Sequence, residues 1–212
     1  PSKQLDAVAT LLPDLEELHY ISTLPSIKQG VQQEIAKASY SFNIQLLDDQ
    51  LSYAELAQHL TNLPPKSALV YAVMHQDRAG VKRPPVDVLR EIQTLVKAPI
   101  FVDFGTLMLP GTLGGHMLDA SKVAQQARQL ILGDSLRSQQ LPLGTLTLDY
   151  TALRHWDIPL SRVPEDSNVI NTPLPFWLDH KKQLIYASIA LLLLVATATA
   201  LMFALRLRTT RL

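Results

Sequence analysis

The sequence has 212 residues, with 19 Lys and Arg against 19 Asp and Glu, so its formal net charge is zero. Its basic residues are scattered, whereas a nucleic-acid-binding protein gathers them in one patch, and this argues against nucleic acid as a partner. It contains no Cys, so no disulfide can staple the fold.

Apolar patterning along the first hundred residues predicts strands alternating with helices. Ser52 followed three residues later by Glu55 is a capping-box pattern, and Pro64-Pro65 would end the helix that it opens. The expected elements are a helix around 5–12, a strand at 18–23, a helix at 26–39 with Ser26 near its N-cap, a strand at 42–47, a helix from 52, a strand at 67–74, a loop at 75–83, a helix at 86–96 and a strand at 100–102.

This alternation predicts an α/β fold. Strands separated by helices of such length favour right-handed βαβ crossovers and a mainly parallel sheet covered on both faces. Further along the chain we expect a Gly-rich loop at 105–117, a helix at 120–132 stopped by Gly133, a short strand at 146–148, a helical turn at 151–156 and an irregular, Pro-spaced segment to Pro175.

Residues 183–205 contain no Asp, Glu, Lys or Arg and predict one transmembrane helix. At about 1.5 Å per residue the stretch is roughly 35 Å long, enough to cross a hydrocarbon core of about 30 Å. Phe176 and Trp177 lie just upstream, where aromatic side chains suit the headgroup region.

Charges beside this helix suggest an orientation. Lys181 and Lys182 precede it, and Arg206, Arg208 and Arg211 follow it. The excess of basic residues after the helix favours a cytoplasmic C-terminus and an N-terminal part outside the cytoplasm. The start of the sequence has neither Met nor an apolar segment, so we expect the chain to be part of a longer protein.

Small residues recur every four positions in the same helix, at Ala196, Ala200 and Ala204. Such a stripe lets a partner helix approach closely, and we expect it to support a homodimer; chance recurrence of a common residue is the alternative.

Polar and aromatic side chains gather after two predicted strands and in the Gly-rich loop. Ligands of open parallel sheets bind outside the carboxyl ends of the strands, so these residues are the candidate ligand site. They are His75, Asp77, Arg78, Asp103, Phe104, Gly114, Gly115 and His116. Ordinary solvated loop residues are the alternative interpretation.

Other chemistries have weak or no support in the sequence. Gly114-Gly115 before a helix resembles a phosphate cradle, but neither nucleotide-binding glycine motif is present and a tight turn explains the pair better. The six His are not spaced as metal ligands, and Asp48-Asp49 suits a turn better than an acid and a base. No metal, cofactor or catalytic site is predicted.

The order of residues over nearly the whole chain resembles the ABC-transporter-type substrate-binding (type 1 periplasmic binding protein-like) sensor domains of bacterial membrane sensor histidine kinases. The residues that carry the resemblance are Leu148-Asp149-Tyr150, Leu153, Trp156, Ile158, Arg162-Val163-Pro164, Asn171, Pro175-Phe176-Trp177 and, upstream, 68–77 and Gly114-Gly115.

The resemblance implies a two-lobed domain that closes on a ligand and moves a membrane helix attached to a kinase or cyclase. It divides the chain into a lobe at 1–158, a Pro-rich connector at 159–178, a transmembrane helix at 179–206 and a short basic cytoplasmic end at 207–212. Relative to the family, the chain starts at the second lobe and stops before any output domain. His116 and Asp119 stand where relatives often carry other residues, so the ligand stays open.

The expected function is therefore a sensory input module in the bacterial inner membrane, with a periplasmic N-terminal domain that binds a small molecule. Pro159, Pro164, Pro173 and Pro175 stiffen the connector, which suits the transmission of displacement. The alternatives are a tethered binding component of a transporter and an accessory subunit that docks on a membrane complex.

Overall fold

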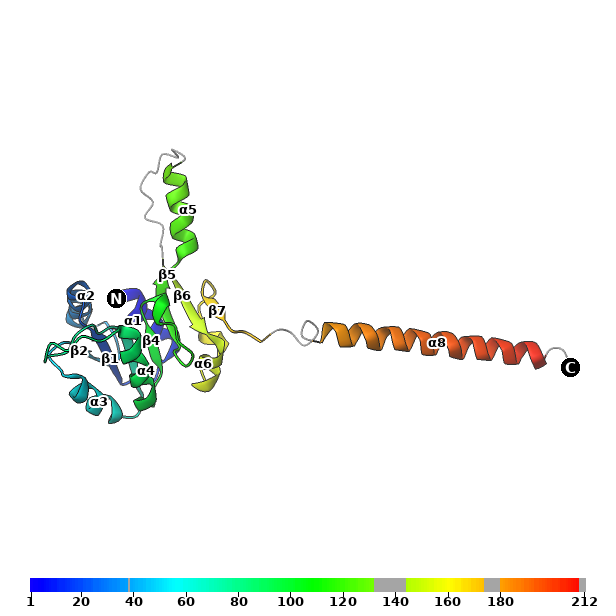
Figure 1. Ribbon diagram of the computed structural model, residues 1–212, viewed down its shortest axis with the longest axis horizontal. Helices are drawn as coiled ribbons and strands as arrows, with labels where there is room; N and C mark the ends of the chain where they lie inside the picture. Colours follow the sequence, from blue (N-terminus) through cyan, green and yellow to red (C-terminus); the bar gives the residue numbers. More distant parts are fainter. Residues whose placement is uncertain (38, 132–143, 174–179, 210–212) are drawn as a thin grey trace. The chain divides into compact units, whose positions relative to one another are not determined.

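The computed structural model describes residues 1–37, 39–131, 144–173 and 180–209, and the chain divides into two compact units, Pro1–Thr172 and Pro173–Leu212. The first unit is an α/β lobe, as the sequence predicts (Figure 1). Its strands are β1 Glu17–Ser22, β2 Asn43–Leu47, β3 Ser67–Val73, β4 Ile100–Val102, β5 Gly114–Leu118, β6 Gly144–Asp149 and β7 Asn168–Ile170.

These strands form one seven-stranded sheet in the order β2-β1-β3-β4-β5-β6-β7. Neighbouring strands are parallel except for β5 and β6, which are antiparallel. The strands β1 to β5 therefore end at one edge of the sheet, called here the carboxyl edge. They begin at the opposite, amino edge, where β6 and β7 end.

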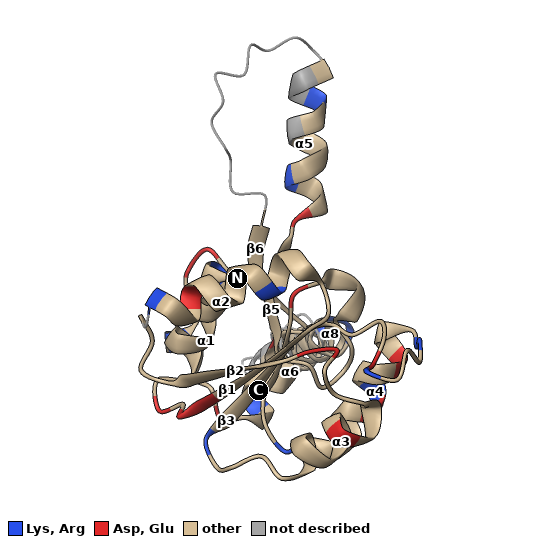
Figure 2. Ribbon diagram, turned by 90° about the vertical axis from the view of Figure 1, so that its left-hand side faces the viewer, with Lys and Arg blue, Asp and Glu red and all other residues tan. Residues whose placement is uncertain are grey.

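Helices cover both faces of this sheet, as β3 requires because all seven of its residues are buried. In Figure 2, α1 and α2 lie on one side of the strands and α3 and α4 on the other. Their bounds are α1 Ser2–Leu11, α2 Pro25–Lys37, α3 Tyr53–Thr61 and α4 Pro85–Leu95, with α5 Ala120–Ile131 and α6 Tyr150–His155 following further along the chain.

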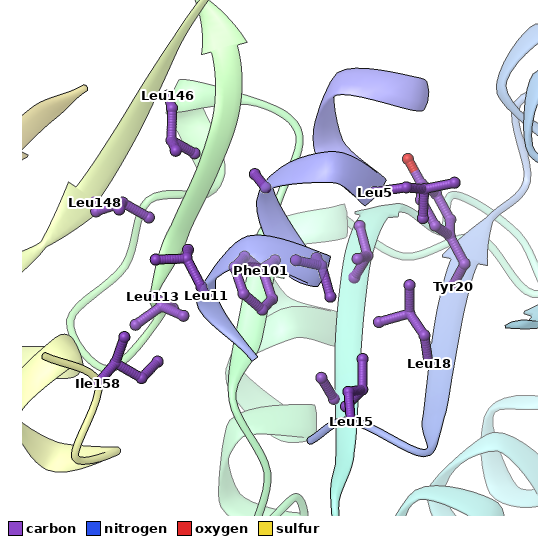
Figure 3. Packing of buried hydrophobic residues seen from close by; sticks show 14 of the residues in the cluster. Leu5, Leu11, Leu15, Leu18, Tyr20, Phe101, Leu113, Leu146, Leu148 and Ile158 are labelled. Carbon is purple, nitrogen blue, oxygen red and sulfur yellow. The ribbon is translucent and has the colours of Figure 1, made fainter. Parts of the chain in front are cut away.

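The core consists of two apolar clusters, one on each face. Leu5 and Leu11 of α1 pack on Leu18, Phe101 and Leu148 of the sheet (Figure 3). On the other face, α3 and α4 contribute the buried side chains Leu56, Leu60, Val88, Leu89 and Ile92. Even and odd residues of the central strands β1, β3 and β4 thus enter different clusters, which is the period-two alternation of a strand buried on both sides.

The capping box predicted at α3 is confirmed. The Ser52 hydroxyl accepts a hydrogen bond from the Glu55 amide at 3.3 Å, and Glu55 accepts one in return from the Ser52 amide at 2.8 Å. The preceding helix, α2, begins at Pro25, so Ser26 lies in its first turn, near the N-cap but not at it. A proline suits the first turn of a helix, where its missing N–H has no partner to lose.

The predicted Gly-rich loop at 105–117 is wrong over its last four residues, 114–117, which belong to β5. A short 3-10 helix, η1 Gly105–Leu107, is followed by a turn and then by β5, which contains Gly114 and Gly115. Glycines have low strand propensity, so the sequence pattern did not predict β5. The segment expected to be irregular also holds a 3-10 helix, η2 Leu160–Arg162, and the edge strand β7.

The second unit contains α8, Lys181–Thr209, as the sequence predicts. Within it, Lys181–Ala200 is long and apolar enough to cross a membrane, and none of this stretch is buried within the structure. The aromatic residues Phe176 and Trp177 and the last arginine, Arg211, lie outside the described residues.

Candidate functional site

The carboxyl edge on the α1 face holds a half-buried acidic residue, Asp103. Tyr20 lies on β1 and is fully buried, and its phenol donates a hydrogen bond to the Oδ2 atom of Asp103, the residue that follows β4. The other carboxylate oxygen, Oδ1, is buried and has no hydrogen-bond partner. Burial raises the pKa of the Asp103 carboxyl above its ordinary value, and the bond from Tyr20 opposes this only in part.

Near the carbonyl of Val102, the residue before Asp103, lies an amide that α1 carries. Gln4 is 3% exposed, and its Oε1 atom accepts a hydrogen bond from the backbone amide of His116 on β5. Its Nε2 atom is buried without a partner. A side chain on Gly115 would come within 2.6 Å of that amide and 2.2 Å of the Val102 carbonyl, so the glycine is what allows Gln4 to approach the sheet.

These groups give the edge one unused acceptor and one unused donor, on Asp103 and Gln4. An unpaired polar atom in a buried place costs about 1–3 kcal/mol, so native structures rarely keep one without a reason. A ligand that offers an N–H group to the carboxylate and an oxygen to the amide would satisfy both atoms.

His116 was predicted at this site, and the structure places it beside a separate cavity. The cavity has a volume of about 290 Å³ and is also lined by Lys3, Asp6 and Lys122. Burial and the nearby Lys3 ammonium lower the pKa of His116, in that order of size. His116 is therefore held toward its neutral form beside charged side chains.

The loop after β3 satisfies its own polar groups. Asp77 is 5% exposed, and its carboxylate accepts hydrogen bonds from the Val81 amide at 2.9 Å and from the Tyr53 amide of α3 at 3.2 Å. Arg78 pairs with Glu55 at 2.9 Å, and His75 is exposed.

Asp77 and Asp103 consequently lie on opposite faces of the sheet. Asp77 bonds to α3, whereas Asp103 bonds to Tyr20, whose side chain packs beneath α1. Of the residues predicted from the sequence, the α1 face gathers Asp103, Gly115 and His116. Phe104, 40% exposed, follows Asp103 directly at the same edge.

A phosphate cradle at Gly114-Gly115 is excluded by the strand that contains them. Gly114 has a φ of +110° and pairs with Leu148 of β6, and a Cβ atom there would lie 2.0 Å from the Thr147 carbonyl oxygen. Its role is the close approach of two strands. Asp48 and Asp49 serve as predicted in a turn, and both pair with Lys28, at 2.7 Å and 3.0 Å.

Within the described ranges, no group of three or more His, Cys, Asp or Glu side chains is arranged to hold a metal ion. The residues that the sequence analysis missed at this edge are Gln4 and Tyr20. Tyr20 is a hydroxyl-bearing residue inside a buried strand, which is a detectable signal, while Gln4 is one of many polar residues on a helix and has none.

A mainly parallel sheet with helices on both faces is a common α/β architecture, and the fold of this lobe is shared by solved substrate-binding proteins. The ligand-free, open structure of CD0873, a substrate binding protein with adhesive properties from Clostridium difficile, is similar with a TM-score of 0.51 at 13% identity, over 81% of this chain and 60% of that one. The ABC domain from Streptococcus pneumonia in complex with L-Trp gives a TM-score of 0.49 at 16% identity, over 79% and 60%.

These likenesses concern the fold. The chain spans 60% of the length of each of the two proteins. No protein-family model and no curated protein matches the sequence. The fold is that of a periplasmic-binding-protein-like α/β lobe, joined in sequence to one candidate membrane-spanning helix.

Proposed function

We propose that this chain is the ligand-binding and anchoring part of a sensor in the bacterial inner membrane. Its α/β lobe lies in the periplasm and binds a small molecule at the carboxyl edge, and α8 spans the membrane and connects the lobe to a kinase or cyclase. A preceding first lobe would supply the other wall of the cleft. The chain itself performs no catalysis.

The observation that carries the binding proposal is the buried carboxylate of Asp103. It stands at the carboxyl end of a central parallel strand, where open α/β sheets bind their ligands. One oxygen is held by Tyr20 and the other is unused, so the carboxylate is oriented and still able to accept a hydrogen bond. The ligand best suited to it carries an amino or other N–H group, as the bound L-Trp of the Streptococcus pneumonia domain does.

A structural route from this edge to the membrane segment favours a sensor. The antiparallel β6 starts at the carboxyl edge and ends at Asp149 on the amino edge. Asp149 caps α6 and accepts a hydrogen bond at 2.6 Å from Asn171, which directly follows β7. The unit ends one residue later, at Thr172. A displacement of β6 would thus act on the residues that lead to α8.

Binding can be tested by thermal denaturation and calorimetric titration with a panel of amino acids, amines, sugars and purines. The titration is run on residues 1–212 and on the protein with any sequence that precedes Pro1. We expect an N–H-bearing ligand to bind, and Asp103→Asn to weaken it at least tenfold, which is about 1.4 kcal/mol.

Asp87→Asn is the matched control, because Asp87 is an exposed carboxylate of α4 that pairs with Arg90. A ligand that binds Asp103→Asn and the parent protein equally would overturn the assignment of this site.

A second candidate function is that of a transporter component, because the similar structure from Clostridium difficile is described as a substrate binding protein. In that case the lobe would deliver its ligand to a transporter, and ligand binding would leave the membrane segment unaffected. Distances between copies that each carry one spin label, at position 185 or in a separate sample at position 202 of α8, are measured with and without ligand. A ligand-dependent change in the distance between copies supports the sensor, and no change supports the transporter component.

A further inference from the structure

The amino edge of the sheet contains a cavity of about 440 Å³, away from the carboxyl edge proposed above as the ligand site. Its walls come from the segments just before β1, β3 and β4 and from the end of α6. Cavities that hold small organic ligands measure about 300–1,000 Å³, so this one is large enough for such a molecule.

Most of the lining is apolar. Leu12 and Leu15 contribute one side and Leu63 the next, while the half-buried indole of Trp156 contributes a broad flat surface. An indole packs well against rings and other rigid apolar groups. A suitable ligand therefore has an apolar body, and an aromatic ring is the group that fits this wall best.

Two exposed cations stand on the same lining, Lys97 and Arg162. Neither forms an ion pair within the part of the chain that the structure describes. A third, Lys66, is paired with Glu16 at 2.6 Å, and the Asp14 carboxylate also lines the cavity. The positive charge available to a ligand therefore comes from Lys97 and Arg162, which outnumber Asp14. A guanidinium offers paired donors that match a carboxylate.

The cavity wall also includes a buried polar group without a partner. Ser67, the first residue of β3, is 5% exposed, and its hydroxyl has no hydrogen-bond partner. Buried hydroxyls in native structures are nearly always satisfied, so this one also indicates a place where a polar group of a ligand belongs.

We propose that this cavity is a second small-molecule site, which takes an organic anion with an aromatic or other apolar body. Lys97 and Arg162 hold the anionic group, and the apolar body lies against Trp156. The site lies at the edge where β6 and β7 end. Its occupant would therefore act on the same residues that lead to α8, Asp149 and Asn171, as a ligand at Asp103.

Trp156 provides the readout, because the sequence has two Trp and Trp177→Phe leaves Trp156 as the single tryptophan, which is excited selectively over Tyr. The probe is dansylglycine, an aromatic carboxylate that accepts energy from an excited indole, and the uncharged dansylamide is its matched control. The full chain carrying Trp177→Phe is placed in phosphatidylcholine nanodiscs and titrated with each.

We expect saturable energy transfer to dansylglycine, with a Kd at least tenfold lower than that of dansylamide. The double variant Lys97→Glu with Arg162→Glu should raise the Kd at least tenfold, whereas Lys82→Glu, a charge reversal outside the cavity, should not. Unchanged binding in the double variant, equal binding of the two probes, or no saturable transfer would each overturn the proposal.

Two further experiments test the source of the natural anion and whether this site is independent of the site at Asp103. If phosphatidylglycerol in the nanodisc competes with dansylglycine, the natural anion is a lipid headgroup; if it does not, the anion is a soluble molecule. Asp103→Asn should bind dansylglycine as the parent protein does, so failure of the carboxyl-edge site would leave this result unaltered.

Discussion

Tyr20 on β1 and Asp103 after β4 are joined by a hydrogen bond that passes over the intervening strand β3. Burial raises the pKa of both side chains above their ordinary values, for Tyr20 chiefly through desolvation and then through the neighbouring carboxylate. The bond therefore fixes a carboxylate in a place where ionisation is costly. Such a cost is common at binding sites, where function outweighs stability.

Asp103→Asn should accordingly stabilise the unliganded protein at neutral pH, by about 1 kcal/mol. The folded-state pKa of Asp103 is raised, so the folded form holds its proton more tightly than the unfolded form. Stability then falls as the pH rises through the window above the ordinary Asp value, and the amide removes this fall. Urea denaturation at pH 4 and pH 7.5 measures the effect. A variant less stable than the parent at pH 7.5 would contradict it.

Acid should destabilise the lobe through a buried imidazole pair. His19 of β1 is 1% exposed, and its Nδ1 atom lies 3.2 Å from the Nε2 atom of His59 on α3. Burial, and secondly the repulsion from His59, lowers the pKa of His19 to about 4. Glu17 lies 3.5 Å from the other ring nitrogen, Nε2.

Because this pKa is lowered, the stabilising contribution is complete above about pH 6.5 and is lost progressively between that pH and about 4, by at most about 3 kcal/mol. His19→Gln should flatten this part of the pH profile in urea denaturation. His155→Gln, at an exposed position on α6, should not. Equal profiles for the parent and His19→Gln would show that another group dominates.

Gly114→Ala should destabilise the lobe severely, by at least about 3 kcal/mol, because the new methyl group meets the Thr147 backbone and neither strand can yield. Gly105 is the matched control: its Cβ atom would meet nothing within 4 Å, so Gly105→Ala should change stability by less than about 0.5 kcal/mol. Thermal denaturation of the two variants compares them directly. Similar losses would contradict the assigned register of β5 and β6.

The cap of α6 should also hold β7. Asp149→Ala removes acceptors for the Thr151 amide, at 2.7 Å, and the Ala152 amide, at 3.2 Å, and also the Asn171 contact, so a loss of about 1–2 kcal/mol is expected. Asp149→Ser keeps a cap but not the second oxygen, and should lose less.

Asn171→Gly isolates the link to β7, because Asn171 has a φ of +56°, which Gly adopts without strain. Hydrogen exchange should become faster at the β7 amides and stay unchanged in α6. Faster exchange in α6 instead would place the contribution of Asn171 in the cap.

The alanine stripe of α8 predicts self-association. Ala196 and Ala200 are exposed, and the side chain of Ala204 lies outside the described residues. Ala200→Ile should weaken association in membranes at least tenfold because a bulky side chain keeps the helices apart. Energy transfer between labelled copies in vesicles measures it, with Ala198→Ile as the control on another face. Unchanged association would remove the stripe from the dimer interface.

The sequence by itself determined the elements with strong local signals. The capping residues Ser52 and Glu55, the largely apolar β3 and the uncharged stretch of α8 each act within one segment, so their patterns suffice. The parallel α/β class followed from the alternation of such segments.

Only the tertiary structure decided which distant residues meet. The bond between Tyr20 and Asp103 and the approach of Gln4 to Gly115 depend on strand order and on the placement of α1, which no local pattern encodes. The same holds for β5, whose two glycines look like a loop until β4 and β6 are seen beside them. Long-range packing, in which the required side chain is set by a neighbour far along the chain, is the physical reason.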